Sequence, residues 1–540
     1  NAANALTRLA TKNADNQMQI SKYCVGLLAN QNTGTQRRAA CVLSDLARDN
    51  PGSPVVIVNA GAISPLVNLL SGGAADVKEE AARALSTLAL NSPSTQLAIA
   101  SGLVVLVGTG SAESQEHVSQ LLLTLSKDAD NCVAIVRAGA VPRLVVQLRG
   151  GGSTSAIAQE LAAAVLACLA ATEDGIRGIL SSNCIRPLVS MLTTGTAGAQ
   201  AYSAVVLAEL ARISNKSSIQ IMSEGGIVPL VAMLGRESSS AAKASAASAL
   251  RTLTSNTEGG SQAELQKAVS DAGAIRPLVA LLSEEDDNIR KRAAGAIAAL
   301  SVGMTEIQDA VEKNKGIGKL VSLLASSVHE EVSAEAAAAL AVLAHNNKKN
   351  QDKLASDGGI EPLISLLNTE GGGDYAKEAS ASALWSLCIG KHHENQVAIA
   401  NAGGIAPLVA VLGLTSEKAR EQAAGALAAL ALDNTKNEEA IAQLIVSLLG
   451  SDDKQASAKA ALAVSRFARA NASNQRSIAK AGGIELLVNL LDVEDARAAP
   501  KEHSNSFSHS APVVLDAAKV QKEMAAALWS MAYNSPENQA

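Results

Sequence analysis

The chain has 540 residues and a net charge of −6, and hydrophobic residues make up 48% of it. Only two Phe, four Tyr and two Trp occur, so a core must be built from Ala, Leu, Val and Ile. The near balance of charge argues against the basic stripe that general nucleic-acid binding requires, and the shortage of aromatic rings argues against base-stacking platforms.

The chain starts at Asn1 without Met, inside a helix-like segment of about residues 1–15, and ends at Ala540 as a new repeat begins. We therefore expect it to be part of a longer protein with partial repeats at both ends. Any lipidation or targeting signal on the true termini would lie outside this sequence.

One motif, Gly-Gly-Ile-x-Pro-Leu-Val-x-x-Leu, recurs along the chain. The ten intervals between Ile63 and Ile484 cover 421 residues, a mean of about 42. The clear copies are Gly61–Leu70, Gly225–Leu234, Gly273–Leu282, Gly358–Leu367 and Gly403–Leu412. A fixed period of this size predicts a stacked solenoid, whereas the length alone would suggest several separate domains.

Some copies of the motif are irregular. The copy at Ser101–Gly110 is weak, and the interval from Ile227 to Ile275 has extra residues in Ser255–Gln262. The repeat aligned at Ala442 is short and has no Gly-Gly pair. The repeat length therefore varies in places along the chain.

The repeat over residues 394–432 shows the predicted internal order. Glu394–Asn401 is expected to be a short first helix that ends at an elbow, where Gly403 supplies a positive φ. A second helix over 405–412 carries Pro407 in its first turn, where the missing N–H costs nothing. Apolar residues at helical spacing predict a longer third helix over Glu417–Leu432.

The final repeat contains an insertion at about Asp492–Pro512 that is rich in Ser, His, Asp and Glu, followed by a segment over 512–540. We place the insertion between the second and third helices of that repeat. A solvated loop is the simpler interpretation, and a partner-binding or phosphorylated loop is the alternative.

The order of short helix, Gly elbow, medium helix and long helix resembles the armadillo repeat. The third helix also carries a recurring Ala-Leu-x-x-Leu pattern, at Ala84–Leu88, Ala249–Leu253, Ala296–Leu300, Ala339–Leu343, Ala383–Leu387 and Ala426–Leu430. HEAT repeats are of similar length but have two helices and lack this elbow. The resemblance implies an all-α, right-handed superhelical solenoid over residues 1–540, with about eleven three-helix repeats plus partial terminal ones.

The Ala-rich style of the motif is most similar to the vacuolar-membrane armadillo scaffold of yeast and related plant and protist proteins. Importin-α, by contrast, reads extended peptides through a Trp and an Asn four residues apart on the third helix. No matching position of this sequence holds a Trp or an Asn. Trp385 and Trp529 lie three residues after the Trp position of that family, and we expect both to pack between repeats.

No catalytic, nucleotide-binding or metal-binding signature is complete in this sequence. Gly318-Lys319 lacks the upstream Gly of a phosphate loop, and neither His329-Glu330-Glu331 nor His393-Glu394-Asn395 completes HExxH. The sequence therefore predicts a protein that is not an enzyme and has no cofactor and no metal.

The cysteines form no CxxC pair and lie mostly among Ala, Val and Leu; they are Cys24, Cys41, Cys132, Cys168, Cys184 and Cys388. Buried reduced thiols of an intracellular, cytoplasmic protein are the expected state. The longest apolar run, Leu161–Ala171, is too short to span a membrane. Peripheral membrane attachment through unseen termini stays open.

In armadillo proteins the third helices line a concave groove that binds partner segments. The polar side chains that we expect to read a partner there are Asp45, Arg83, Thr87, Gln120, Thr124, Glu209, Thr252, Ser382 and Ser386. A solvated helix face without a partner is the alternative. Around Gly295–Val342 and Gly425–Ala429 the groove should be smooth and apolar, which suits a partner helix better than an extended basic peptide.

The resemblance implies a non-catalytic scaffold or adaptor that binds one or more proteins and no nucleic acid. A structural subunit of a large assembly, for example a ciliary or cytoskeletal one, is the alternative, and a nuclear transport adaptor is less favoured. Purification from the native source would separate the first two: an adaptor should be monomeric, and a structural subunit should occur only in a stoichiometric particle. The oligomeric state is left open.

Overall fold

The structure, a computed structural model, describes residues 2–11, 13–50, 52–89, 93–151, 154–255, 260–326, 329–369, 371–414, 416–451, 454–469, 471–495, 517–533 and 535–539. All regular elements in these ranges are helices. The chain packs as two units, Asn1–Ala274 and Ile275–Ala540.

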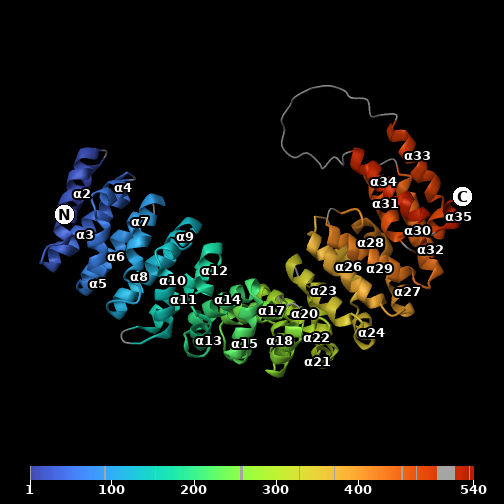
Figure 1. Cartoon of the computed structure of the whole chain (residues 1–540), viewed down its shortest axis with the longest axis horizontal. Coiled ribbons are helices and arrows are strands. Elements are labelled where there is room, and N and C mark those ends of the chain that lie inside the picture. Colours follow the sequence, from blue (N-terminus) through green and yellow to red (C-terminus); the bar gives the residue numbers. More distant parts are fainter. Residues whose placement is uncertain are drawn as a thin grey trace. The chain divides into compact units, whose positions relative to one another are not determined.

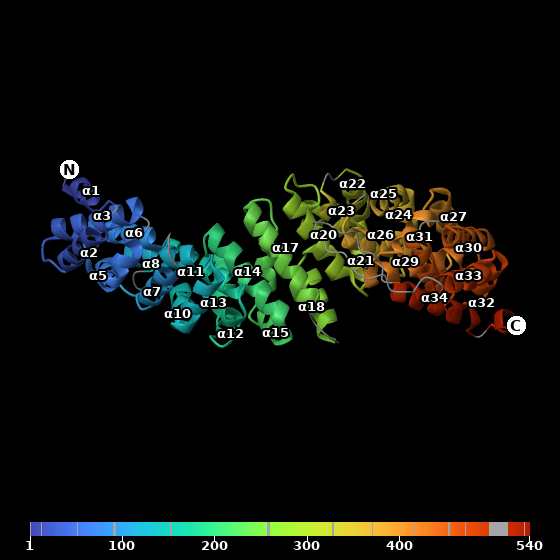
Figure 2. The same ribbon diagram turned by 90° about the horizontal axis from the view of Figure 1, so that it is seen from above.

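In most repeats the third helix is the longest one. Figure 2 shows α3, α6, α8, α11 and α14 following one another in the first unit. The third helices are α3 (Thr33–Asp49), α6 (Ala75–Ala89), α8 (Ala112–Leu125), α11 (Ala156–Ala170), α14 (Ala197–Ile213), α17 (Ser240–Ser255), α20 (Asp287–Ser301), α23 (Glu330–Ala344), α26 (Asp374–Cys388), α29 (Glu417–Ala431), α31 (Lys454–Phe467) and α34 (Ala517–Ala532).

Shorter first and second helices precede most of the third helices (Figure 1). The first helices are α4 (Ser53–Asn59), α7 (Pro93–Val104), α9 (Ala129–Arg137), α12 (Glu173–Leu180), α15 (Asn215–Ser223), α18 (Gly260–Asp271), α21 (Thr305–Lys313), α24 (Lys348–Ser356), α27 (His393–Asn401), α32 (Ala472–Lys480) and α35 (Pro536–Gln539). The second helices are α5 (Ile63–Gly72), α10 (Ala140–Arg149), α13 (Ile185–Thr194), α16 (Ile227–Ala232), α19 (Ile275–Leu281), α22 (Gly316–Ser326), α25 (Ile360–Leu367), α28 (Ile405–Val411) and α33 (Gly483–Asp495).

The three-helix order predicted for residues 394–432 is confirmed by α27, α28 and α29, with boundaries that differ by no more than one residue. Gly403 has a φ of 78° at the elbow, as expected. The same elbow position has positive φ at Gly61, Gly139, Asn183, Gly225, Gly273, Lys315, Gly358, Gly403 and Gly482. The elbow is thus a backbone device that recurs through both units.

Where the elbow is missing, the first and second helices change. The repeat aligned at Ala442 has one continuous helix, α30 (Thr435–Leu449), and α2 (Ala14–Leu28) has the same form in the first unit. In the weak copy at Ser101–Gly110, α7 runs on to Val104 and turns replace a regular second helix. Loss of the Gly elbow therefore fuses or shortens helices, while the third helix is kept.

The core of each unit is built from the Ala-Leu-x-x-Leu pattern. In α17, Leu250 and Leu253 are both 0% exposed, and Leu427 and Leu430 of α29 are also 0% exposed. Residues three and four apart lie on one side of a helix, so each pair points into the stack. Ala fills the remaining interior positions and lets neighbouring helices approach closely.

Amide side chains of the first helices tie successive third helices together. Asn395 donates from Nδ2 to the carbonyl of Leu387 at the end of α26, at 2.9 Å. The neighbouring Gln396 donates from Nε2 to the carbonyls of Ala429 (2.8 Å) and Leu432 (3.0 Å) at the end of α29. The same arrangement recurs at Asn350-Gln351 and Asn474-Gln475. The last carbonyls of a helix have no partner within it, so these amides satisfy acceptors in two repeats at once.

The ends of the array differ in part from the sequence interpretation. At the N-terminal end, α1 (Ala2–Ala10) packs against α3. The predicted loop at 492–512 begins within α33, which runs to Asp495, and its remaining residues lie outside the described part of the chain. In the segment over 512–540, α34 packs against α31 as a third helix does, and α35 follows it.

Candidate partner-binding face

Successive third helices lie directly against one another in each unit. The Ser155 hydroxyl of α11 donates to Oε1 of Glu116 in α8 at 2.5 Å, and Thr196, the N-cap of α14, donates to Glu160 of α11. Residues that follow one another at intervals of four, three and four positions lie on the same side of a helix. On α11 these are Ile157, Leu161, Ala164 and Cys168. We call the surface made by these four positions on each third helix the third-helix face.

All nine polar residues predicted to read a partner lie on third helices, but their exposure differs. The exposed residues are Arg83, Gln120 and Thr124. The half-buried residues are Asp45, Glu209, Thr252 and Ser382. The buried residues are Thr87, which is 7% exposed, and Ser386, which is 3% exposed.

Thr87 takes part in the stacking of repeats. Its Oγ1 lies 3.1 Å from Oγ of Ser44 in the preceding third helix and donates to the carbonyl of Arg83 at 2.9 Å. Because Thr87 and Ser386 are buried, they have little surface for a partner, whereas the sequence predicted that both would contact one. Their depth depends on the neighbouring repeat, about 42 residues away, which a single-helix pattern does not show.

Two other predicted hydroxyl groups are turned back onto their own helices. Thr124 donates to the carbonyl of Gln120 at 3.0 Å, and Thr252 donates to the carbonyl of Ser248 at 3.0 Å. A hydroxyl that bonds the carbonyl four residues earlier keeps only acceptor capacity for a partner.

The charged predicted residues form pairs within their own helices. Asp45 lies 3.2 Å from Arg48, and Glu209 lies 2.8 Å from Arg212. Arg83 lies 3.3 Å from Glu80, with about half of its side chain (47%) exposed. Surface pairs of this kind contribute little stability, about 0–1 kcal/mol, and exchange partners readily. Arg83 and Gln120 are therefore the predicted residues best placed to meet a partner.

The structure adds apolar members to this face that the sequence interpretation did not include. Ile157 of α11 is 57% exposed, Tyr202 of α14 is 39% exposed and Tyr375 of α26 is 44% exposed. They lie about one to three turns before the positions that match the importin-α Trp and Asn. These three residues could have been found by continuing the intervals of four and three residues toward the N-terminus of each third helix.

A smooth apolar groove was predicted on α20 and α23, where the structure has small side chains. Gly295, Ala299, Ala338 and Val342 are small side chains that are half-buried or buried on α20 and α23. Trp385 packs against the next repeat, as expected, because a Cβ atom on Gly425 would lie 2.7 Å from its indole. Trp529 differs from the prediction.

Trp529 is 62% exposed, and its ring lies beside that of Tyr533, with centroids 4.9 Å apart and planes tilted by 37°.

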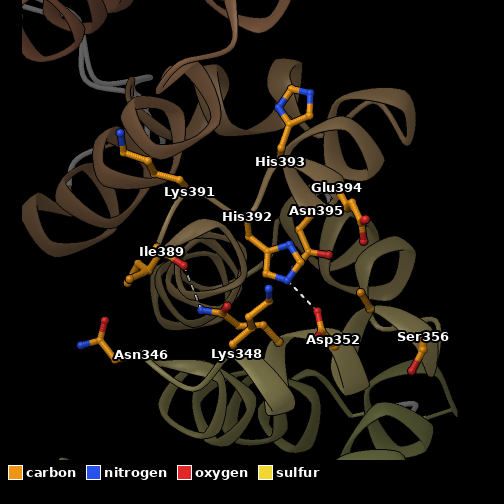
Figure 3. Close-up of a pocket in the computed structure, with 13 residues that line it drawn as sticks. Asn346, Lys348, Asp352, Ser356, Ile389, Lys391, His392, His393, Glu394 and Asn395 are labelled. Carbon is orange, nitrogen blue, oxygen red and sulfur yellow. Dashed lines mark hydrogen bonds and ion pairs between the residues drawn. The ribbon is translucent and has the colours of Figure 1, made fainter.

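A cavity of about 720 Å³ lies where α24 meets the start of α27. Figure 3 shows His392 turned toward Asp352, with Nε2 2.6 Å from Oδ1. Lys391 pairs with Asp433 at 2.7 Å, and this hydrogen bond raises the pKa of the lysine. These groups join one repeat to the next instead of converging on a point inside the cavity. Among the residues that the structure describes, no group of three or more His, Cys, Asp or Glu side chains could hold a metal ion.

Within the described residues no single helix is both long and apolar enough to cross a membrane. Two pairs of helices that are joined at a sharp bend, α4 with α5 and α9 with α10, are long and apolar enough when the two helices of each pair are counted together.

Two segments of the chain, residues 50–90 and 262–302, match the family model of the Armadillo/beta-catenin-like repeat. Each segment contains one of the positive-φ elbows, at Gly61 and Gly273, with the long helix after it. The chain belongs to the armadillo repeat family. This armadillo protein is also similar to the crystal structure of an engineered protein, with 30% identity and a TM-score of 0.64 over 76% of this chain and 99% of that one.

Two curated relatives come from Arabidopsis thaliana. Protein CELLULOSE SYNTHASE INTERACTIVE 3 is 24% identical over 258 residues, which are 48% of this armadillo chain. Protein CELLULOSE SYNTHASE INTERACTIVE 2 is 25% identical over 214 residues, which are 38% of it. The matched region covers 10% of the length of each of these plant proteins.

Proposed function

We propose that this armadillo protein is a non-catalytic scaffold that binds segments of other proteins along its third-helix face. The observation that carries the proposal is the set of exposed side chains on that face that the fold does not need. Arg83 and Gln120 supply polar contacts, and Ile157 and Tyr202 supply apolar ones. Exposed apolar groups grouped on one face are typical of binding surfaces.

The architecture supports the same role. A solenoid contacts itself only between neighbouring repeats, so its long lateral faces stay available to partners. The names of the two plant relatives record an interaction with another protein, which supports the general role and not a particular partner. We also propose that the protein works in a reducing compartment, because all six cysteines are free thiols.

Affinity capture from the native source tests the proposal with two matched double variants of the first unit. Arg83→Ala with Gln120→Ala removes one cation and one amide from the third-helix face. Lys216→Ala with Gln220→Ala removes the same groups from the first helix α15, where both are exposed. The proposal requires a stoichiometric partner that is lost from the first variant and kept by the second. Loss from the second variant alone would contradict it.

A further inference from the structure

The apolar side chains of the third-helix face are concentrated on two neighbouring helices of the first unit. Ile157 of α11 and Tyr202 of α14 are 57% and 39% exposed, and Leu161 and Val205 are half-buried. Ile157 and Leu161 are four residues apart, and Tyr202 and Val205 are three apart, so each pair forms a stripe on its helix. We call these four residues the α11–α14 patch.

The two stripes adjoin each other. Glu160 of α11 accepts a hydrogen bond from Thr196 at the start of α14, and a Cβ atom on Gly198 would collide with its carboxylate. Leu161 follows Glu160 directly, and Tyr202 lies one turn beyond Gly198. The patch is therefore one continuous surface across two helices, which pack about 8–10 Å apart.

Two carboxylates border this surface. Glu116 of α8 accepts from the Ser155 hydroxyl, and Glu160 accepts from Thr196. The ion pairs of the described residues near this surface join Lys78 to Glu113 and Arg212 to Glu209, and involve neither of these two carboxylates. A hydroxyl donor leaves the negative charge in place, so the rim of the patch favours a cationic group on an incoming partner.

The α11–α14 patch has a single side chain that can form a hydrogen bond, the phenol of Tyr202. On α11 the stripe consists of Ile157, Leu161, Ala164 and Cys168. On α14 the polar member, Glu209, is held by Arg212 at 2.8 Å. One phenol cannot satisfy the row of backbone N–H and C=O groups of an extended peptide, whereas a helix satisfies its own.

We propose that the α11–α14 patch binds an amphipathic helix of a partner protein, whose apolar stripe is bordered by Lys or Arg side chains that pair with Glu116 and Glu160. This inference rests on the proposed function and gives it one place and one class of partner. A helix about 10–12 Å wide fits the surface of two packed helices.

Three synthetic peptides of about 18 residues, or five turns, test the proposal by fluorescence anisotropy with the whole chain. The first has a Leu stripe flanked by Lys and Arg, the second has the same stripe flanked by Glu, and the third is a scramble of the first. We expect the first peptide to bind at least about tenfold more tightly than either of the others, and added salt to weaken it.

Substitutions in the protein then show where the peptide binds. Ile157→Ser with Tyr202→Ser should weaken the basic peptide by about tenfold, and Glu116→Gln with Glu160→Gln should lower both its affinity and its salt dependence. Val228→Ser is the matched control, because this side chain is 66% exposed but lies on the second helix α16. Circular dichroism of each variant confirms that it is folded.

Equal binding of the basic and acidic peptides would overturn the proposal, as would an effect of Val228→Ser equal to that of the patch variants. Absence of binding by the basic peptide would overturn it as well. In that case the scaffold role would still stand if captured partners depend on Arg83 and Gln120. If the basic peptide does not bind and captured partners do not depend on Arg83 and Gln120 either, the proposed function fails as well.

Discussion

The indole of Trp385 occupies the space that Gly425 leaves open on the third helix of the next repeat. A Cβ atom at Gly425 would lie 2.7 Å from Cδ2 and Cε2 of the ring. The largest side chain of α26 is thus paired with the smallest possible residue of α29. This pairing sets how closely the two helices approach.

Gly425→Ala should therefore destabilise the second unit by about 1–3 kcal/mol, because the added methyl group overpacks the contact. The measurement is the thermal unfolding midpoint together with amide exchange in α26 and α29. In a Trp385→Leu background the same substitution should have little effect.

Gly26→Ala is the matched control for this substitution. Gly26 is also within a helix, but nothing lies within 4 Å of its added Cβ. Here Ala should stabilise by about 0.5–1 kcal/mol through its better helix propensity. Destabilisation of the same size at both glycines would contradict the proposed fit between Trp385 and Gly425.

Gly403→Val should destabilise the elbow between α27 and α28 by about 1–2 kcal/mol or more. The cause is the backbone alone, since φ is 78° and an added Cβ would meet nothing within 4 Å. Gly403→Asn should be tolerated better, because Asn183 holds the corresponding elbow at a φ of 48°. Chemical denaturation of the three proteins compares them, and equal stability of the Val and Asn variants would refute the assignment.

Gln396→Met should destabilise the joint between α27 and α29 by about 1–3 kcal/mol. The variant keeps most of the side-chain volume but removes the Nε2 donor, so the carbonyls of Ala429 and Leu432 lose a buried partner. Val397→Met, at the neighbouring position that is 39% exposed, should change stability by less than about 0.5 kcal/mol. Thermal unfolding of both variants decides whether the amide or the substitution itself matters.

Stability should fall as the pH rises above about 9. Burial raises the pKa of Cys184 and of Cys388 to about 12, and the pKa of Cys24 and of Cys132 to about 11, from 9.0. Above pH 9 the unfolded chain releases these protons while the folded chain holds them, so the unfolded state is favoured. The contribution is complete below pH 9 and is lost progressively up to about pH 11–12.

Unfolding midpoints between pH 7.5 and 10.5 check this expectation. Because Lys and Tyr also titrate in that range, the comparison is with Cys184→Ala combined with Cys388→Ala. The double variant should show a shallower loss of stability with pH. Parallel curves for the two proteins would show that the buried thiols contribute nothing.

Much of the fold could be predicted because its signals are local. The φ of Gly403, the early Pro407 and the apolar spacing of α29 act within a few residues, and their predicted boundaries agree with the structure. The fusion of helices in α30 follows from the missing Gly-Gly pair. The Asn-Gln pairs of the first helices were not predicted, because their role depends on carbonyls of two other helices.

The candidate site could be predicted only in part, because exposure depends on the neighbouring repeat. Thr87 is buried against Ser44, which lies 43 residues away. Trp385 and Trp529 follow the same Ala-Leu pattern, yet Trp385 meets Gly425 and Trp529 is 62% exposed. Ile157 and Tyr202 were missed because the positions known from importin-α cover only part of each third helix.

Site-specific photocrosslinking in cells of the native source tests the central claim most directly. A photoreactive amino acid replaces Tyr202 on the third-helix face of α14 in one protein and Val228 on α16 in the other, two exposed positions of the same unit. If the third-helix face is the binding surface, Tyr202 should yield a discrete crosslinked partner and Val228 should not. A partner crosslinked from Val228, with none from Tyr202, would contradict the account.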